Sequence, residues 1–262
     1  MHRNLTVTIV QPDIIWKSIR ENLDRYSVML SGHTAKTDLI LFPEMFPTGF
    51  STEPEGIDET MDGYAVRWMK RTAESLKCSV AGSLVIRENR RFFNRLIFID
   101  PYENMTWYDK RHLFRMDGEE LKFTAGMERA IVPLKGWNIC FQICYDLRFP
   151  VWSRNRDDYD VLVYLANWPA ARSDVWNILL KARAIENQSY VIGVNRVGTD
   201  GNSISYIGES MVINPKGIIA GDFPASKEAV KTFTLSWDDL EEFRKKFPVW
   251  KDRDEFRVIG KR

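Results

Sequence analysis

The sequence predicts an α/β fold in which mixed β-sheets are covered by helices. Short apolar runs of strand length alternate with segments whose apolar residues recur every three or four positions, the spacing of an amphipathic helix. Several strand-like runs follow one another across short turns, and such hairpins do not fit a purely parallel sheet. No linker rich in Pro, Gly or Ser divides the 262 residues. We therefore expect one domain over residues 1–262.

The first half of the chain alternates between strands and helices. The β-branched run at 5–10 predicts a strand, and Pro12 and Asp13 are expected to open a helix after it. The apolar face of that helix carries Trp16, Ile19, Leu23, Tyr26 and Leu30. The other elements expected in this half are a strand at 38–42, a helix at 64–77, and a hairpin of strands at 79–87 and 92–99.

The second half repeats this alternation. Strands are expected at 137–143, 160–165, 190–197, 206–213 and 229–235. Ser173 and Asp174 are expected to cap a helix that runs to Asn187, and residues 214–217 predict a turn. A short charged helix at 238–247 begins a C-terminal segment, residues 238–262, whose end is polar and irregular.

Charge and hydropathy exclude several classes of protein. The 37 Lys and Arg residues nearly balance the 36 Asp and Glu residues, so the net charge is +1 and nothing favours a nucleic-acid partner. No apolar run approaches the roughly 18 residues of a membrane-spanning helix. The N-terminal apolar run is too short for a secretory signal peptide. We therefore expect no membrane association and a cytoplasmic location.

Cysteine and histidine are scarce, with three residues of each. The cysteines Cys78, Cys140 and Cys144 are an odd number, and without a signal peptide they predict no disulfide framework. The histidines are too few for a zinc site built from several His and Cys, and no CxxC or HExxH spacing occurs, so no metal site is expected. The absence of a GxSxG motif excludes a Ser-His-Asp hydrolase of that type.

Three polar residues follow apolar segments, where the edge of a sheet can form a site. Glu44, Lys110 and Cys144 each stand at such a place. Taken singly, they have ordinary alternatives: an exposed loop glutamate, a solvated basic cluster and an inert core cysteine. Taken together, they suggest acyl transfer. With histidine nearly absent, a cysteine nucleophile needs a carboxylate as its base, while Lys110 and the backbone N–H after Cys144 can stabilise an oxyanion.

The segments around these residues resemble the nitrilase superfamily of carbon–nitrogen hydrolases. They occur in that family's order and with spacings of its kind: Phe42–Glu44, Tyr108–Leu113 and Cys144–Pro150. The resemblance implies a four-layer αββα sandwich, a homodimer or higher homo-oligomer, and catalysis with no metal or organic cofactor. It also implies that Glu44 is the general base, Lys110 the oxyanion donor and Cys144 the nucleophile.

A second glutamate belongs to the same resemblance. Many members carry an E-x-x-x-F-x-x-G pattern, and Glu119–Gly126 fits it, with Glu119 rather than Glu120 at the right distance from Phe123. The implied role of Glu119 is to hold Lys110 or to orient the substrate amide. The alternative is that both glutamates are surface charges.

Further segments look like the bacterial omega-amidase branch, which hydrolyses 2-oxoglutaramate and 2-oxosuccinamate: Leu165–Arg172, Ala182–Gln188, Asn195–Gly198 and Phe247–Trp250. Such substrates carry a carboxylate, and Arg172 is the candidate partner for it, with a surface or interface arginine as the alternative. The other candidate binding groups are the backbone N–H of Tyr145 and a pocket wall of Asn167 and Trp168. Simple packing is the alternative for Trp168.

The sequence therefore predicts an amidohydrolase that releases ammonia from a small 2-oxo dicarboxylic acid amide through a cysteine thioester. Its partners are a small-molecule amide and further copies of the chain. The alternatives are another superfamily amidase, an N-carbamoyl amidohydrolase, a nitrilase, or a catalytically silent interaction protein on the same fold. A redox pair of Cys140 and Cys144 is disfavoured, because on one strand they would lie ~13 Å apart.

Overall fold

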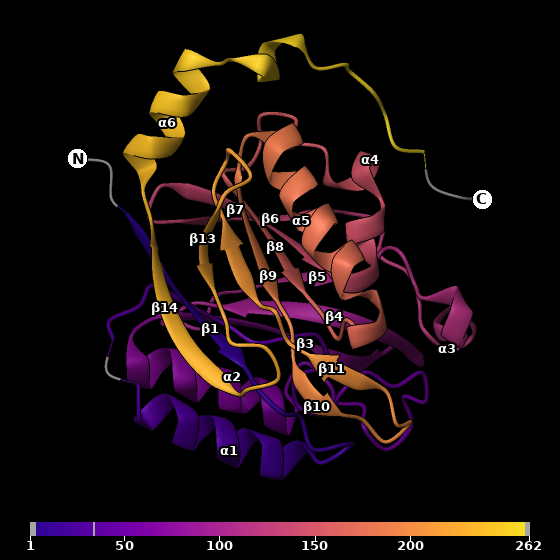
Figure 1. The fold of residues 1–262 in the computed structure, drawn as a ribbon. Coiled ribbons are helices and arrows are strands. Elements are labelled where there is room, and N and C mark those ends of the chain that lie inside the picture. Colours follow the sequence, from indigo (N-terminus) through magenta and orange to yellow (C-terminus); the bar gives the residue numbers. More distant parts are fainter. Residues whose placement is uncertain (1–3, 34, 260–262) are drawn as a thin grey trace.

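The computed structural model describes residues 4–33 and 35–259, which form four layers in the order helix, sheet, sheet, helix (Figure 1). The first six-stranded sheet has the order β14-β1-β2-β3-β4-β5, and the second has the order β13-β12-β9-β8-β7-β6. Helices α1 (Ile19–Ser31) and α2 (Tyr64–Leu76) cover the first sheet, and α5 (Ser173–Asn187) covers the second. The αββα sandwich implied by the resemblance is thereby confirmed.

Each sheet contains six strands. Those of the first sheet are β1 (Leu5–Gln11), β2 (Leu39–Leu41), β3 (Ser79–Glu88), β4 (Arg91–Ile99), β5 (Met105–Asp109) and β14 (Ala229–Leu235). Those of the second are β6 (Ala130–Leu134), β7 (Trp137–Ile143), β8 (Val161–Leu165), β9 (Tyr190–Val194), β12 (Met211–Ile213) and β13 (Ile219–Asp222). A separate hairpin pairs β10 (Val197–Thr199) with β11 (Ser205–Ile207), and two one-turn helices are α3 (Glu119–Lys122) and α4 (Pro150–Ser153).

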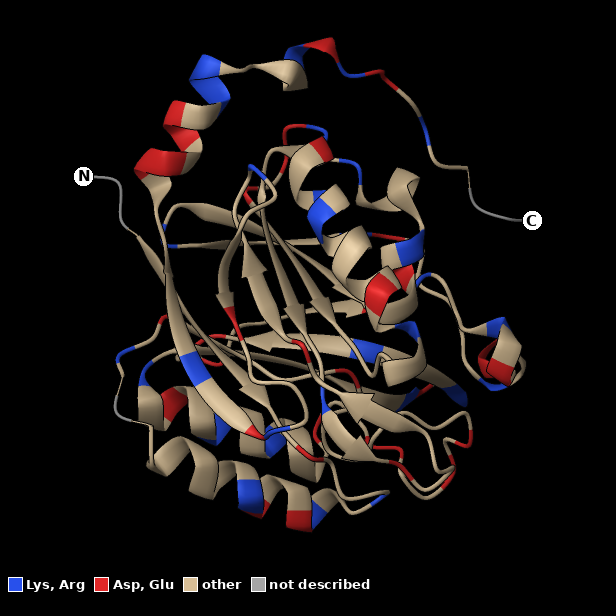
Figure 2. Cartoon of the chain, viewed as in Figure 1, with Lys and Arg blue, Asp and Glu red and all other residues tan. Residues whose placement is uncertain are grey.

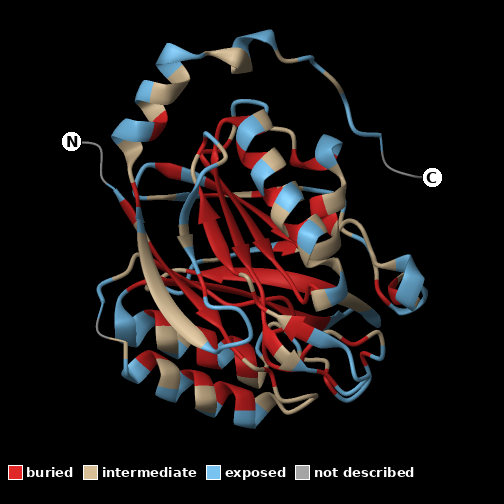
Figure 3. Cartoon of the chain, viewed as in Figure 1, coloured by how far each residue is buried: buried red, intermediate tan, exposed pale blue. Residues whose placement is uncertain are grey.

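The two sheets pack face to face through side chains that alternate along each strand. In β1, Val7 and Ile9 point between the sheets, whereas Val10 packs in the layer of α1 and α2. Ile139 and Phe141 of β7 meet the first sheet from the other side and are fully buried. Figure 3 shows the strands as the buried interior and the outer faces of the helices as exposed. This apolar layer fixes how the two sheets lie relative to each other.

The carboxyl ends of parallel strands carry the polar loops of interest. Strand β2 runs parallel to β1 and β3, and β8 runs parallel to β7 and β9. Parallel neighbours end at the same edge of a sheet. Glu44 follows β2 in the first sheet, while Cys144 and Asn167 follow β7 and β8 in the second. The stacked sheets therefore bring these three residues to one place.

Helix α1 begins later than the Pro12–Asp13 pair predicts, so that expectation is wrong. Asp13 instead forms an isolated β-bridge with Val197. Lys17 then adopts a φ of 53°, which a right-handed helix excludes. A contact with a distant strand thus holds Asp13 in an extended conformation, and a turn at Trp16 and Lys17 precedes the start of the helix at Ile19.

Two strands expected in the second half are each divided. The run 190–197 stops at Val194 and resumes as β10, and the run 206–213 splits into β11 and β12. At the second break, Gly208 and Glu209 have φ values of 79° and 58°, which interrupt the extended backbone. The sequence does not predict β5, β6 or β13, each of which is an edge strand of its sheet.

The two C-terminal helices agree with the expected ranges within a residue. Helix α5 ends at Asn187 as expected, but Arg172 rather than Ser173 precedes it, and no side chain caps it. Helix α6 (Trp237–Lys246) has acidic residues in its first turn and basic residues in its last, as Figure 2 shows, which suits the helix dipole. The segment after it contains a 3₁₀ turn at Val249–Asp252, and residues 260–262 lie outside the described part of the chain.

Within the described ranges, no helix is long and apolar enough to cross a membrane. The same residues contain no group of three or more His, Cys, Asp or Glu side chains placed to hold a metal ion. Cys78, Cys140 and Cys144 are all free thiols. Cys140 lies within β7 and Cys144 lies just beyond its end.

Candidate active site

Glu44 lies in the turn that follows β2, and its side chain is fully buried. Its Oε1 atom accepts hydrogen bonds from Lys110 Nζ at 2.9 Å and from Asn94 Nδ2 at 2.8 Å. Its Oε2 atom accepts one from the backbone N–H of Asn167 at 3.0 Å. The alternative of an exposed loop glutamate is therefore wrong. Three donors from three different segments fix the orientation of this carboxylate.

Lys110 follows β5 and is 1 % exposed, so it does not belong to a solvated basic cluster. Its Nζ atom donates to Glu44 and, at 3.1 and 2.9 Å, to both carboxylate oxygens of Glu119. Burial by itself would lower the pKa of the ammonium group. The carboxylates of Glu119 and Glu44 outweigh this effect and raise the pKa of Lys110 above its usual value. Lys110 therefore stays positively charged.

Glu119 is the first residue of α3 and is also fully buried, so the surface-charge alternative is wrong for it. Besides Lys110, its Oε2 atom accepts a hydrogen bond from the backbone N–H of Phe114 at 2.6 Å. Burial raises the pKa of Glu119, and the charge of Lys110 opposes that rise. Glu119 does not line the cavity described below. Its contact with the site runs through Lys110.

Cys144 is the first residue after β7 and opens a 3₁₀ turn, Cys144–Arg148. Its φ of 41° is left-handed, which costs an ordinary residue roughly 1–3 kcal/mol and turns the chain sharply out of the sheet. The thiol lies 3.9 Å from the carbonyl oxygen of Asn167. Burial and the charge of Glu44 raise the pKa of the Cys144 thiol well above its usual value, against the opposing effect of Lys110. The resting residue is thus a thiol next to a base.

A cavity of about 250 Å³ opens above these groups. Its lining includes Glu44, Phe50, Lys110, Phe114, Met116, Asp117, Cys144, Tyr145, Arg148, Asn167, Trp168, Pro169, Arg172, Ile204 and Tyr206. The guanidinium of Arg172 lies 5.4 Å from the ring of Phe114, and that of Arg148 lies 5.3 Å from the ring of Trp168. Neither arginine forms an ion pair with a described residue. The cavity therefore offers two guanidinium groups that an anionic ligand can engage.

The structure brings all the predicted site residues to one place. The four predicted substrate-binding residues line the cavity together with Glu44, Lys110 and Cys144, and Glu119 stands behind Lys110. The sequence argument missed Asn94 and Arg148. Asn94 interrupts the apolar run of β4, and Arg148 stands four positions after Cys144 in a segment already singled out. A polar residue inside a buried strand was the available signal for Asn94.

The comparison with known proteins decides the family. Residues 6–245 match the carbon–nitrogen hydrolase family. The chain belongs to this family. It is 45 % identical over 254 residues to the omega-amidase YafV of Escherichia coli (strain K12), covering 97 % of this chain and 98 % of that protein. It is 31 % identical over 254 residues to the 2-oxoglutaramate amidase of Bacillus subtilis (strain 168), covering 94 % and 96 %.

A solved structure is similar over the whole chain. It is XC1258 of Xanthomonas campestris, described as a CN-hydrolase superfamily protein with an arsenic adduct in the active site. The TM-score is 0.95 at 42 % identity, covering 98 % of this chain and 100 % of that one. The resemblance to the nitrilase superfamily and to its omega-amidase branch is therefore confirmed. The chain is a hydrolase of carbon–nitrogen bonds other than peptide bonds.

The raised pKa of the Cys144 thiol leads to a prediction about its reactivity. A raised pKa means a smaller thiolate fraction at any given pH, and only the thiolate is alkylated. We expect the rate of Cys144 alkylation by iodoacetamide to rise about tenfold per pH unit and to continue rising beyond ~8.5, where a free cysteine levels off. Peptide mass spectrometry measures the rate.

The control for this measurement is Cys144→Ser, which leaves the two buried cysteines Cys78 and Cys140 in place. A Cys144 alkylation rate that levels off at or below pH ~8.5 contradicts the prediction.

Proposed function

We propose that the chain is an omega-amidase that hydrolyses the side-chain amide of a small 2-oxo dicarboxylic acid amide such as 2-oxoglutaramate. The observation that carries this proposal is the meeting of Glu44, Lys110 and Cys144 in a cavity that also holds two guanidinium groups, neither of which pairs with a carboxylate of the described residues. The similarity to omega-amidases and 2-oxoglutaramate amidases supports the choice of substrate.

Acylation begins when Glu44 takes the proton of the Cys144 thiol and the sulfur attacks the amide carbon. The carbonyl oxygen becomes an oxyanion, which the Lys110 ammonium and the backbone N–H of Tyr145 stabilise. That N–H is free to do so, because the first N–H groups of a helical turn have no acceptor within it. Glu44 then gives its proton to the amide nitrogen, the carbon–nitrogen bond breaks, and ammonia leaves. A thioester on Cys144 remains.

Deacylation repeats these steps with water. Glu44 takes a proton from a water molecule, whose oxygen attacks the thioester carbon, and the same two donors stabilise the second oxyanion. The carbon–sulfur bond breaks, the sulfur regains its proton from Glu44, and the 2-oxo acid is released. These steps require only the chain's own groups and water, so we retain the prediction that no metal or organic cofactor takes part.

Glu119 and Asn94 have supporting roles in this proposal. Glu119 balances and orients the Lys110 ammonium at 2.9 Å. Asn94 donates to Glu44 at 2.8 Å and to Glu119 at 3.3 Å, so it separates two carboxylates that would otherwise repel each other. The proton therefore moves between Glu44 and the reacting atoms while Lys110 keeps its charge.

The substrate carboxylate is assigned to Arg172, with Arg148 beside it. A guanidinium binds a carboxylate through two parallel N–H donors, and a cavity of about 250 Å³ suits a small acid rather than a long chain. Asn167 and Trp168 form the wall between these arginines and Cys144 in the proposed complex. A carboxylate at the far end would place the amide over the thiol.

Replacing the nucleophile tests the proposed chemistry. We expect purified wild-type protein to release ammonia from 2-oxoglutaramate and Cys144→Ala to release none above the uncatalysed rate, because no thioester can form. An enzymatic ammonia assay measures both. A panel of simple amides, carbamoyl amines and nitriles serves as the comparison. Undiminished release by Cys144→Ala, or a clear preference for a carbamoyl amine or nitrile, would overturn the proposal.

Replacing Arg172 tests the assignment of the carboxylate. Loss of a charge-assisted hydrogen bond is worth about 1.5–3 kcal/mol, so we expect Arg172→Met to raise KM for 2-oxoglutaramate roughly 10- to 100-fold. The matched control is Arg115→Met, an exposed residue that does not line the cavity, for which KM should not change. Equal KM values for wild type and Arg172→Met contradict the assignment.

We also propose that the chain forms a homodimer through the outer face of α5. That face exposes Ile178 at 64 % and Ile185 at 56 %, and large exposed apolar side chains mark interaction surfaces. We expect light scattering after size exclusion to give twice the chain mass for wild type and the monomer mass for Ile178→Asp. The control is Val28→Asp on the exposed side of α1. A monomeric wild type contradicts this proposal.

A cytoplasmic location remains part of the proposal. Three free thiols support a reducing compartment, because disulfides form mainly in oxidising ones.

A further inference from the structure

The carboxylate of Asp146 joins the two strand ends that carry Cys144 and Lys110. Asp146 is fully buried and lies two residues after Cys144. Its Oδ2 atom accepts a hydrogen bond from the backbone N–H of Ile143, the residue before Cys144, at 3.0 Å. This hydrogen bond links the side chain of Asp146 to the backbone of Ile143 across the sharp turn at the end of β7.

The other bonds of Asp146 reach the segment of Lys110. The hydroxyl of Tyr108 donates to Oδ2 at 2.7 Å. His112 donates to Oδ1 through its backbone N–H at 3.0 Å, and its ring Nδ1 lies 2.7 Å from the same atom. Tyr108 and His112 stand two positions before and two positions after Lys110. One carboxylate therefore binds the lysine segment on both sides and the cysteine turn at the same time.

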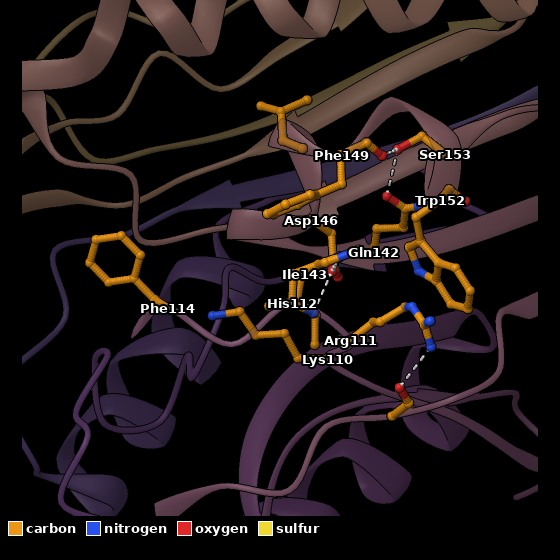
Figure 4. A network of polar contacts seen from close by, with 12 residues as sticks. Lys110, Arg111, His112, Phe114, Gln142, Ile143, Asp146, Phe149, Trp152 and Ser153 are labelled. Carbon is orange, nitrogen blue, oxygen red and sulfur yellow. Dashed lines mark hydrogen bonds and ion pairs between the residues drawn. The ribbon is translucent and has the colours of Figure 1, made fainter. Parts of the chain in front are cut away.

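Aromatic rings pack against this cluster. The ring of His112 stacks on that of Phe149 with 3.8 Å between ring centroids and an interplanar angle of 7°. The indole of Trp152 donates to the hydroxyl of Tyr108 at 3.0 Å. Figure 4 shows the segment of Lys110 and His112 facing the residues that follow β7. A fully buried carboxylate with four polar contacts has little freedom to move.

Asp146 acts on the reaction only through other residues. Neither Asp146, Tyr108 nor His112 lines the cavity. Lys110 follows a strand of the first sheet and Cys144 follows a strand of the second. Among the hydrogen bonds of the described residues none joins these two side chains directly. Their separation must therefore be set by what connects their segments.

We propose that Asp146 is a positioning residue that fixes the distance between the Lys110 ammonium and the Cys144 sulfur across the two sheets. This distance matters most when the oxyanion must contact the Lys110 ammonium while the carbon that carries the oxyanion is bonded to the Cys144 sulfur. A displacement of about 1 Å at such a point costs roughly 100-fold in rate. The expected effect of Asp146 on the rate rests on the proposed function, whereas its positioning of the two segments does not.

The test compares Asp146→Asn with a matched variant at the other end of β7. Asp160 accepts a hydrogen bond from the backbone N–H of Asn138 at 2.9 Å and pairs with Arg244, far from the cavity. Asp160→Asn therefore removes a buried carboxylate of the same kind. With both variants folded by circular dichroism, we expect kcat to fall roughly 100-fold in Asp146→Asn and to stay near wild type in Asp160→Asn, with KM within about twofold in both.

A second readout does not depend on the substrate. In Asp146→Asn the thiol is no longer held at its wild-type distance from Glu44, whose charge raises its pKa, and from Lys110, whose charge lowers it, so the pKa of Cys144, read from its alkylation by iodoacetamide against pH, should differ from that of wild type. In Asp160→Asn it should not change. If wild type releases no ammonia from 2-oxoglutaramate but this shift occurs, the proposed substrate is wrong and the positioning role stands.

Tyr108→Phe decides the question should Asp146→Asn not fold. It removes one hydroxyl donor from the carboxylate, and we expect kcat to fall about tenfold with KM unchanged. The inference is overturned if folded Asp146→Asn, or Tyr108→Phe in its place, keeps wild-type kcat and wild-type Cys144 titration. It is also overturned if Asp160→Asn loses as much activity as Asp146→Asn.

Discussion

A buried ammonium group between two buried carboxylates is the interaction on which the site depends. Lys110 would lose its charge in an apolar interior if Glu119 and Glu44 did not flank it. Breaking either contact leaves an uncompensated buried charge, which is far more costly than the loss of a surface ion pair. The loop after β2, the end of β5 and helix α3 are held together by this triad. The geometry of these two ion pairs therefore fixes how the three segments lie relative to one another.

The same triad explains how one carboxylate can exchange protons while another does not. Glu44 contacts Lys110 with one oxygen and Asn167 with the other, whereas both oxygens of Glu119 contact Lys110. Glu44 also lines the cavity, which Glu119 does not. The two glutamate side chains thus have different surroundings. These surroundings suit Glu44 to proton transfer and Glu119 to holding Lys110.

Apolar periodicity predicted most of the strands and helices, because it is a local property of the chain. The four layers and the roles of the site residues came from the resemblance to the nitrilase superfamily. The prediction of elements from the sequence was wrong where contacts between distant segments decide the local structure. The β-bridge of Asp13 to Val197 delays α1, and the positive φ angles at Gly208 and Glu209 divide a strand. It also missed Asn94 and Asp146, since their importance comes from partners far along the chain. A single sequence carries no record of which buried polar groups will meet.

The placement of the site across two stacked sheets has a consequence for how the protein loses function. Glu44 and Lys110 follow strands of one sheet, and Cys144 and Asn167 follow strands of the other. A denaturant, pressure or heat that loosens the apolar layer between the sheets would separate these groups while each sheet still keeps its own hydrogen bonds. Enzymatic turnover therefore depends on the tertiary packing between the two sheets. It should disappear before the circular dichroism of the strands and helices changes, as the first sign of a loosening interior.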